Sequence, residues 1–266
     1  MPDSSVSEES TPAHLIYRFA ASPNAMNAEN PYDKPADTVS LADEDAVKQV
    51  LVQAVFGLWD VVNNLTRLRP SKRDRYRVTI FGSARAAPGS EAYEATKQAA
   101  AELAAMGCDV VTGGGPGLMQ AANEGALSAP ERVQSLGIRV HLPFEQDANA
   151  FVSEAFEHRT FFTRLHQFVL TSDAYIVAPG GIGTVLETMM IWQLLQVRHL
   201  RDTPLILVGR MWPGLVEWAT STMLSFDPPL AGPEDFAIPR CVTSANEAIE
   251  LVRSSYDQWR HRNPTQ

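Results

Sequence analysis

Between residues 47 and 65, apolar side chains recur at intervals of three and four residues and form one continuous stripe. This spacing predicts an amphipathic helix. Asp43, Glu44 and Asp45 precede the stripe, where acidic side chains complement the helix dipole and favour a helix start. A stripe this wide needs a partner, which is either the main domain or another subunit.

Two polar segments flank this predicted helix. Residues 1–40 are rich in Ser, Pro, Asp, Glu and Asn without sustained periodicity, which favours a mobile tail. Residues 67–77 carry six basic residues in eleven. A solvated linker is the preferred interpretation of that run, and a nucleic-acid arm is the alternative. We therefore expect a disordered tail (1–40), a helix with a basic linker (41–76) and one main domain (77–266).

From residue 77 onward, short apolar runs alternate with segments of helical periodicity. The expected strands are 78–81, 109–112, 136–140, 174–178, 204–208 and, more weakly, 240–243. The expected helices are 90–106, 118–127, 158–171, 184–198, 212–224 and 244–260. Because the strands are apolar on both faces, this alternation predicts a parallel sheet with helices on both faces. The fold class is α/β, a Rossmann-like doubly wound sheet of about six to seven strands.

Composition narrows the class of protein. The 266 residues are 45% hydrophobic and 20% charged, with a net charge of −9, which disfavours a nucleic-acid binder. No apolar run approaches the roughly 18 residues of a membrane span. The acidic, polar N-terminus resembles neither a signal peptide nor a transit peptide. Cys108 and Cys241 lie far apart in apolar surroundings, which argues against a disulfide framework or a zinc site. We expect a cytoplasmic globular protein.

In doubly wound sheets, ligands bind at the carboxyl ends of the strands, near the point where the strand order reverses. Three of the predicted strands end in glycine-bearing turns: Gly82-Ser83, the GGGPG loop at 113–117 and the PGGIGT loop at 179–184. Glycine lets backbone amides approach a ligand closely. The helix that follows adds unpaired N–H groups and a positive dipole end. Together these features predict a phosphate cradle.

The loop sequences also indicate which phosphate ligand is favoured. A dinucleotide fingerprint needs glycine at the sixth position, where these loops have Leu118 and Leu186. The chain contains no Gly-Lys pair, so it lacks the Walker A loop of nucleoside triphosphate hydrolases. A monophosphate needs one cradle only, which favours a nucleoside monophosphate as ligand. No cofactor is expected.

Charged residues near these loops supply candidate chemistry. Glu187 either caps the helix together with Thr184 in a capping box, or lies beside the phosphate loop and faces a bound sugar. Arg159 and Arg164 precede the strand at 174–178, and either bind an anion or lie on the surface.

Other chemistries find less support. The histidines at 141, 158, 166 and 199 show no paired spacing, so no metal site is predicted. Ser83 does not stand in a G-x-S-x-G elbow, which argues against a hydrolase triad.

The run Pro179-Gly180-Gly181-Ile182-Gly183-Thr184-Val185-Leu186-Glu187 resembles PGGxGTxxE, the hallmark of the LOG ("lonely guy") family, which is often mislabelled as lysine decarboxylase. Arg164 stands fifteen residues before the proline, as an arginine does in the family. The segments 81–85, 112–126 and 136–149 resemble the longer bacterial branch, and the resemblance covers about residues 77–210. The family usually has Lys where this chain has Leu165.

The resemblance implies a phosphoribohydrolase, which cleaves the N-glycosidic bond of a cytokinin riboside 5′-monophosphate or of AMP. It implies that Arg164 and Glu187 are the catalytic pair. The implied phosphate and nucleotide contacts are Gly82, Ser83, Gly114, Gly115, Met119, Arg159, Pro179, Gly180, Gly181, Gly183 and Thr184. It also implies a homodimer or higher oligomer with the site at the subunit interface. The alternative is a non-catalytic carrier of a nucleotide or of the molybdenum cofactor. Amino-acid decarboxylation is disfavoured, because no lysine context for pyridoxal phosphate is evident.

Overall fold

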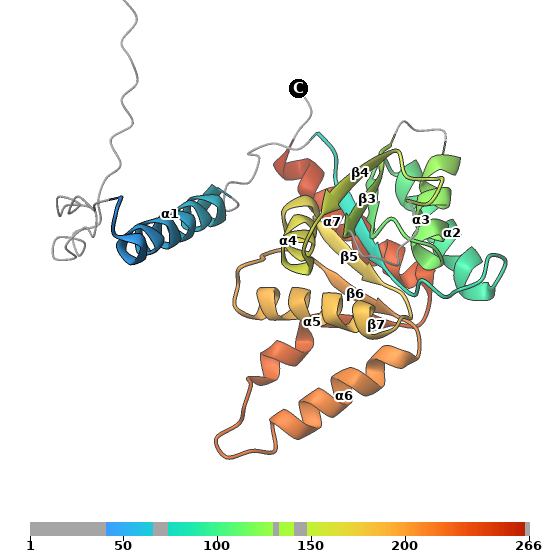
Figure 1. Cartoon of the computed structure of the whole chain (residues 1–266). Helices are drawn as coiled ribbons and strands as arrows, with labels where there is room; N and C mark the ends of the chain where they lie inside the picture. The colour runs from blue at the N-terminus through green and yellow to red at the C-terminus, as the bar shows by residue number, and fades with distance from the viewer. Residues whose placement is uncertain (1–40, 66–73, 130–132, 141–147, 264–266) are drawn as a thin grey trace, which may run out of the picture. The chain divides into compact units, whose positions relative to one another are not determined.

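The computed structural model describes residues 41–65, 74–129, 133–140 and 148–263. The predicted tail and most of the predicted basic linker lie outside these residues. The chain divides into two compact units, Met1–Leu65 and Thr66–Gln266. In the first unit, α1 (Glu44–Leu65) is the helix that the apolar stripe predicts (Figure 1). Its first turn is capped by Asp43, whose Oδ1 accepts a hydrogen bond from the Ala46 amide at 3.1 Å.

The second unit is built on seven parallel strands, in the order β4-β3-β2-β1-β5-β6-β7. The strands are β1 (Arg77–Phe81), β2 (Asp109–Thr112), β3 (Ser135–Val140), β4 (Glu154–His158), β5 (Ala174–Val177), β6 (Leu205–Val208) and β7 (Pro239–Val242). The chain builds outward from β1 to β4, then returns to the other side of β1 and builds outward again to β7. The strand order therefore reverses between β1 and β5, and the predicted fold class is confirmed.

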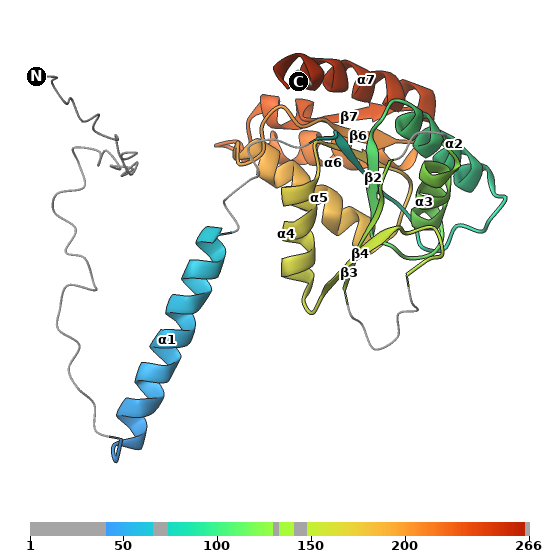
Figure 2. The same cartoon turned by 90° about the horizontal axis from the view of Figure 1, so that it is seen from above.

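Six helices cover the sheet, three on each face (Figure 2). They are α2 (Glu91–Ala105), α3 (Leu118–Ser128), α4 (Phe161–Thr171), α5 (Ile182–Gln196), α6 (Met211–Met223) and α7 (Ala245–Arg262), and a short 3₁₀ helix, η1 (Pro233–Ala237), precedes β7. The faces follow from strand alternation. Val78 and Ile80 pack under α2, α3 and α7, whereas Phe81 packs under α4, α5 and α6. Both faces are buried, as the continuously apolar strands predict.

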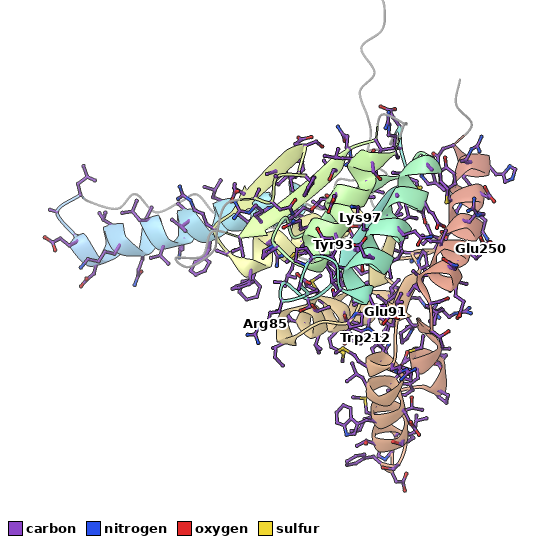
Figure 3. The ribbon with its side chains drawn as sticks, turned by 90° about the vertical axis from the view of Figure 1, so that its right-hand side faces the viewer. Arg85, Glu91, Tyr93, Lys97, Trp212 and Glu250 are labelled. Carbon is purple, nitrogen blue, oxygen red and sulfur yellow. The ribbon has the colours of Figure 1, made fainter. Side chains whose placement is uncertain are left out.

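Helices α2 and α3 pack especially closely against each other. Gly125 of α3 lies where any Cβ would collide with the Lys97 carbonyl of α2. Tyr93 and Lys97 lie on α2 (Figure 3). Glu124 of α3 joins the two helices, because it accepts hydrogen bonds from Tyr93 Oη at 2.7 Å and Lys97 Nζ at 2.6 Å. These contacts hold the second half of α3 against α2.

The strand β4 was not predicted, and the helix predicted at 158–171 begins only at Phe161. The sequence EAFEH is too polar to read as a buried strand, and the structure explains why. β4 is an edge strand that pairs only with β3, and both of its glutamates are exposed. Thr160 caps α4, since its hydroxyl accepts a hydrogen bond from the Thr163 amide. Among the described residues, no helix is long and apolar enough to cross a membrane.

Candidate functional site

The turn after β1 joins three segments at the point where the strand order reverses. Gly82 follows β1, and a Cβ there would press on the side chains of Leu118 and Ala178. The Ser83 amide donates to the Pro179 carbonyl at 3.1 Å, and the Ser83 carbonyl accepts from the Leu118 amide at 2.9 Å. The glycine loops after β1, β2 and β5 are therefore held side by side.

The PGGIGT loop forms the beginning of α5. Gly181 is the N-cap, so the amides of residues 181–184 precede the first intrahelical hydrogen bond, which runs from Val185 N to Gly181 O at 3.0 Å. Gly180 packs against the Thr184 side chain, where a Cβ would clash. By contrast, Gly181 and Gly183 have open space where their Cβ atoms would be. The end of α5 thus presents unpaired amides and the positive end of the helix dipole to that space.

The GGGPG loop after β2 lies against the side chains of Arg164 and Met119. A Cβ on Gly113 would lie 2.5 Å from Arg164 Nη2, and one on Gly115 would lie 2.8 Å from Met119 Cε. Gly114 has a φ of +70°, a left-handed conformation that glycine adopts without strain. Its amide donates to Thr112 Oγ1 at 2.9 Å. Glycine at these positions leaves room for the arginine head group.

Arg164 reaches this loop from the first turn of α4. Its Nε donates to the Ile138 carbonyl of β3 at 2.9 Å, and its guanidinium lies 5.3 Å from the centre of the Phe168 ring. Its Nη1 donates to Glu187 Oε1 at 2.9 Å. These contacts come from three elements, which fixes the guanidinium of a side chain that is only 13% exposed.

Glu187 lies in the second turn of α5 and is buried, with 8% of its surface exposed. Burial raises the pKa of Glu187 to about 7, and the nearby Arg164 guanidinium offsets only part of this rise. The carboxylate pairs with Arg164, and the helix begins at Ile182, two residues before Thr184. The capping-box interpretation of Thr184 and Glu187 was therefore wrong, because Gly181 takes the N-cap position.

A buried hydrogen-bond network supports the glycine loop from below. Asn123 of α3 is fully buried, and its Oδ1 accepts from Thr112 Oγ1 at 2.7 Å and from Asn149 Nδ2 at 3.0 Å. Its Nδ2 donates to Ser135 Oγ at 2.8 Å. Asn149 also donates to the Gly115 carbonyl at 2.9 Å. Neither asparagine was predicted from the sequence, although Asn123 is a polar residue in the largely apolar sequence of α3.

The remaining predicted residues have varied surroundings. Arg159 is exposed between β4 and α4. Leu165 is buried, so the position where the family usually has Lys faces the protein interior. Within the described part of the chain, His158 Nε2 and His166 Nε2 are buried without a hydrogen-bond partner. His141 lies outside the described residues. No cluster of metal-ligating side chains occurs among those that are described.

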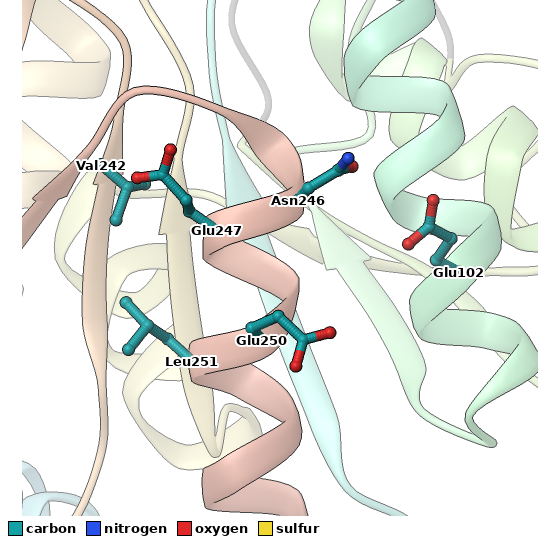
Figure 4. A pocket seen from close by; sticks show the side chains of 6 residues that line it. All are labelled: Glu102, Val242, Asn246, Glu247, Glu250 and Leu251. Carbon is teal, nitrogen blue, oxygen red and sulfur yellow. The ribbon is translucent and has the colours of Figure 1, made fainter.

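A hollow of the surface between α2 and α7 is lined by other residues. Glu102 of α2 and Glu250 of α7 project toward each other there, and Glu247 lies one turn earlier on α7 (Figure 4). None of the residues that line it belongs to the glycine loops or to the Arg164–Glu187 pair. It is therefore separate from the candidate site.

A family model described as "possible lysine decarboxylase" matches residues 119–252, half of the chain. The chain belongs to this family. The match spans Arg164, the PGGIGT loop and Glu187, and it agrees with the resemblance to LOG proteins and their frequent label. No curated protein matches the chain.

Solved structures of the same fold include molybdenum cofactor proteins. The molybdenum cofactor binding protein of Rippkaea orientalis is 21% identical with a TM-score of 0.51, and the match covers 69% of this chain and 98% of that one. The molybdenum cofactor carrier protein of Chlamydomonas reinhardtii is 18% identical with a TM-score of 0.52, covering 68% and 98%. At these identities, the likeness establishes the LOG-type fold alone.

Proposed function

We propose that this LOG-family protein hydrolyses the N-glycosidic bond of a nucleoside 5′-monophosphate, either AMP or a cytokinin riboside 5′-monophosphate, to the free base and ribose 5-phosphate. The observation that carries the proposal is the buried Arg164–Glu187 pair, one turn from the unpaired amides at the start of α5. A phosphate cradle and a carboxylate on the same helix suit a sugar phosphate, whose phosphoryl group can bind the amides while its anomeric carbon faces the carboxylate.

The phosphate binds at the N-terminus of α5. The amides of Gly181, Gly183 and Thr184 donate to its oxygens, and the open space beside Gly181 and Gly183 admits them. No lysine or second cradle is required, because one phosphoryl group is bound. Binding there orients the ribose toward Glu187.

Glu187 acts on the anomeric carbon. Cleavage of an N-glycosidic bond passes through an oxocarbenium-like state, which an adjacent carboxylate stabilises electrostatically. Glu187 takes a proton from the attacking water as the water oxygen bonds to C1′. The C1′–N bond breaks, and its electron pair leaves with the base, which takes up a proton from solvent. Arg164 orients the carboxylate and the sugar phosphate.

The electrostatics of the site suit a general base. A base is most effective when its pKa lies near the working pH, and burial raises the pKa of Glu187 to about 7. Near neutrality the carboxylate is therefore substantially ionised and still basic enough to accept a proton from water. The burial that raises the pKa of Glu187 thus favours the chemistry.

The surface around the site supports the proposed homodimer. Ile182, Leu186 and Met189 recur along one face of α5 and are exposed, whereas Glu187 faces inward. Phe161 and Phe162 are exposed at the start of α4. Exposed apolar side chains grouped in this way mark interaction surfaces. A second copy covering this face of α5 would place the site at the interface.

The decisive experiment is to incubate the full-length protein with AMP and to measure free adenine and ribose 5-phosphate. We expect turnover by the wild type and a loss of at least about 100-fold with Glu187→Gln. The matched control is Glu91→Gln, an exposed carboxylate at the start of α2 (Figure 3). Lysine and the molybdenum cofactor serve as alternative ligands.

Each alternative has its own outcome. Release of carbon dioxide from lysine would support decarboxylation. Tight molybdenum cofactor binding without AMP turnover would support the carrier. Hydrolysis that survives Glu187→Gln in a destabilised protein would show that Glu187 is structural. The dimer is tested with Leu186→Glu, which we expect to yield monomers in light scattering and to lower activity. Leu127→Glu, an equally exposed leucine on α3, should do neither.

A further inference from the structure

A second candidate binding site lies at the amino ends of β6 and β7, at the other end of the strands from the glycine loops. A pocket of about 500 Å³ opens there, between the α5–β6 connection, the start of β7 and the second half of α7. It shares no residue with the glycine loops or the Arg164–Glu187 pair. The phosphate cradle lies beyond the carboxyl ends of the strands, so the two places are separated by the length of the sheet.

Three arginines line this pocket. Arg198 and Arg201 come from the α5–β6 connection, and Arg240 comes from β7. The only acid in the lining, Asp202, pairs with Arg262 at 3.1 Å, so it does not neutralise them. Within the described part of the chain, none of the three arginines forms an ion pair. In a protein of net charge −9, this is a local concentration of positive charge.

The connection that carries two of these arginines has an unusual backbone. Arg198 and Asp202 have φ values of 58° and 54°, in the left-handed region that residues other than glycine rarely adopt. Leu200, which lies between them, is buried, and its amide donates to the Leu194 carbonyl at 3.0 Å. The connection is therefore anchored in a fixed shape that leaves Arg198 and Arg201 on the rim of the pocket.

The rest of the lining is apolar with a few hydroxyl and amide groups. Leu195, Ile206, Ile238 and Leu251 provide the apolar surface, and Ser254 and Gln258 of α7 provide polar atoms. An apolar wall that suits a flat ring, together with several guanidinium groups, is the chemistry of a site for an aromatic anion. Arginines from separate segments suit an anion that carries more than one phosphoryl group.

We propose that this pocket binds a nucleoside polyphosphate, with the base against the apolar wall and the phosphates on Arg198, Arg201 and Arg240. The site is distinct from the monophosphate cradle on α5, and it does not depend on the proposed hydrolysis. It gives the protein a second place at which a nucleotide binds.

The test is a titration of the full-length protein with ADP by calorimetry, at about 0.15 M salt, where weak surface attraction is screened. We expect Arg240→Gln and Arg198→Gln each to weaken ADP binding at least tenfold. Arg253→Gln, an exposed arginine of α7 outside the pocket, removes the same charge and should change nothing. Gly181→Asp, which blocks the cradle on α5, should leave this binding intact. Thermal melting checks that every variant is folded.

Tripolyphosphate and adenosine separate the two halves of the ligand, and both should bind more weakly than ADP. Tripolyphosphate binding as tightly as ADP would overturn the role of the base, and adenosine binding as tightly would overturn the role of the arginines. Absence of ADP binding, or binding lost in Gly181→Asp but kept in the arginine variants, would overturn the site. None of these outcomes bears on AMP turnover, which is measured separately.

Discussion

Polar groups have opposite surroundings at the two ends of the parallel strands, which we call the amino edge and the carboxyl edge of the sheet. At the amino ends of β1 and β2, Asp109 accepts hydrogen bonds from the Gln134 amide at 2.9 Å and from Arg77 Nε at 3.3 Å. Tyr76 Oη donates to Ser255 Oγ at 2.8 Å, and its ring packs edge-on against Tyr256 and Trp259. At the carboxyl ends, glycines leave space beside unpaired amides, and a carboxyl group is buried where its pKa rises.

This contrast separates stability from function. The amino edge between β1 and β2 satisfies its buried polar groups, so its residues contribute to the free energy of folding. At the carboxyl edge, the amides at the start of α5 stay unpaired, and the Glu187 carboxylate is buried although burial disfavours its charged form. Such an arrangement is typical of binding and catalytic sites. Substitutions at the amino ends of β1 and β2 should therefore change stability, and those at the carboxyl edge should change activity.

The largest effect is expected from Asp109→Ala at the amino edge. The carboxylate is almost fully buried and bonds to one amide and two arginines, so its removal takes the acceptor from the Gln134 amide and the counter-charge from both arginines. We expect the free energy of unfolding to fall by about 3 to 4 kcal/mol. Urea denaturation measures this change. Glu250→Ala, an exposed carboxylate paired with Arg253, should have little effect.

The same contrast explains how much could be predicted from the sequence. The strands that build the interior are continuously apolar, and their six runs predicted all strands except β4. The glycine loops, Arg164 and Glu187 could be assigned to one edge, because the carboxyl ends of parallel strands must meet there. The spacing of residues along the chain and the parallel direction of the strands are sufficient to place these residues at one edge.

What could not be predicted depends on long-range contacts. The N-cap of α5 is Gly181 and not Thr184, so the capping-box pattern of Thr184 and Glu187 was misleading. The polar strand β4 is stabilised by pairing with β3, a contact that its own residues do not indicate. Asn149 reaches the GGGPG loop from more than thirty residues away. Each of these features requires the folded sheet.

The next effect concerns the pH dependence of stability at the carboxyl edge. Glu187 has a folded pKa of about 7 against an ordinary value of 4.5. Because the folded state binds this proton more tightly, the associated stability is present below pH 4.5 and is lost as the pH rises through 7. Wild type should therefore lose at most about 3 kcal/mol relative to Glu187→Gln between pH 4.5 and pH 8. Urea denaturation of both proteins across this range measures the difference, and parallel curves would contradict it.

Activity should follow the opposite sign. The proposed base acts in its ionised form, so kcat/KM for AMP should rise with pH and level off above about pH 7. The phosphate of AMP also titrates, near pH 6. A thiophosphate analogue, whose second pKa is lower, separates the two groups. If the pH at which kcat/KM levels off is lower with the analogue, the titrating group is the phosphate of the substrate and not Glu187.

A smaller effect is expected from Asn123→Leu, beneath the GGGPG loop. The substitution removes one buried hydrogen bond each from Thr112, Ser135 and Asn149, and we expect a loss of about 2 kcal/mol in the free energy of unfolding. Because Asn149 also holds the Gly115 carbonyl, KM for AMP should rise more than kcat falls. Asn246→Leu, at an exposed position of α7, is the control. A loss of stability with an unchanged KM would restrict the network to a structural role.

The smallest effect on stability distinguishes the start of α5 from the start of α6, the next helix at the carboxyl edge. Gly183 lies in the first turn of α5 and Gly214 in α6, and neither has an atom within 4 Å of its Cβ position. Alanine at either position should stabilise the helix by roughly 0.5 to 1 kcal/mol, because glycine has the lower helix propensity. Only Gly183→Ala places a methyl group where the phosphate is proposed to bind, so only that variant should raise KM for AMP. Equal gains in melting temperature with different KM values would locate the cradle at α5. An unchanged KM in both variants would contradict phosphate binding at the start of α5.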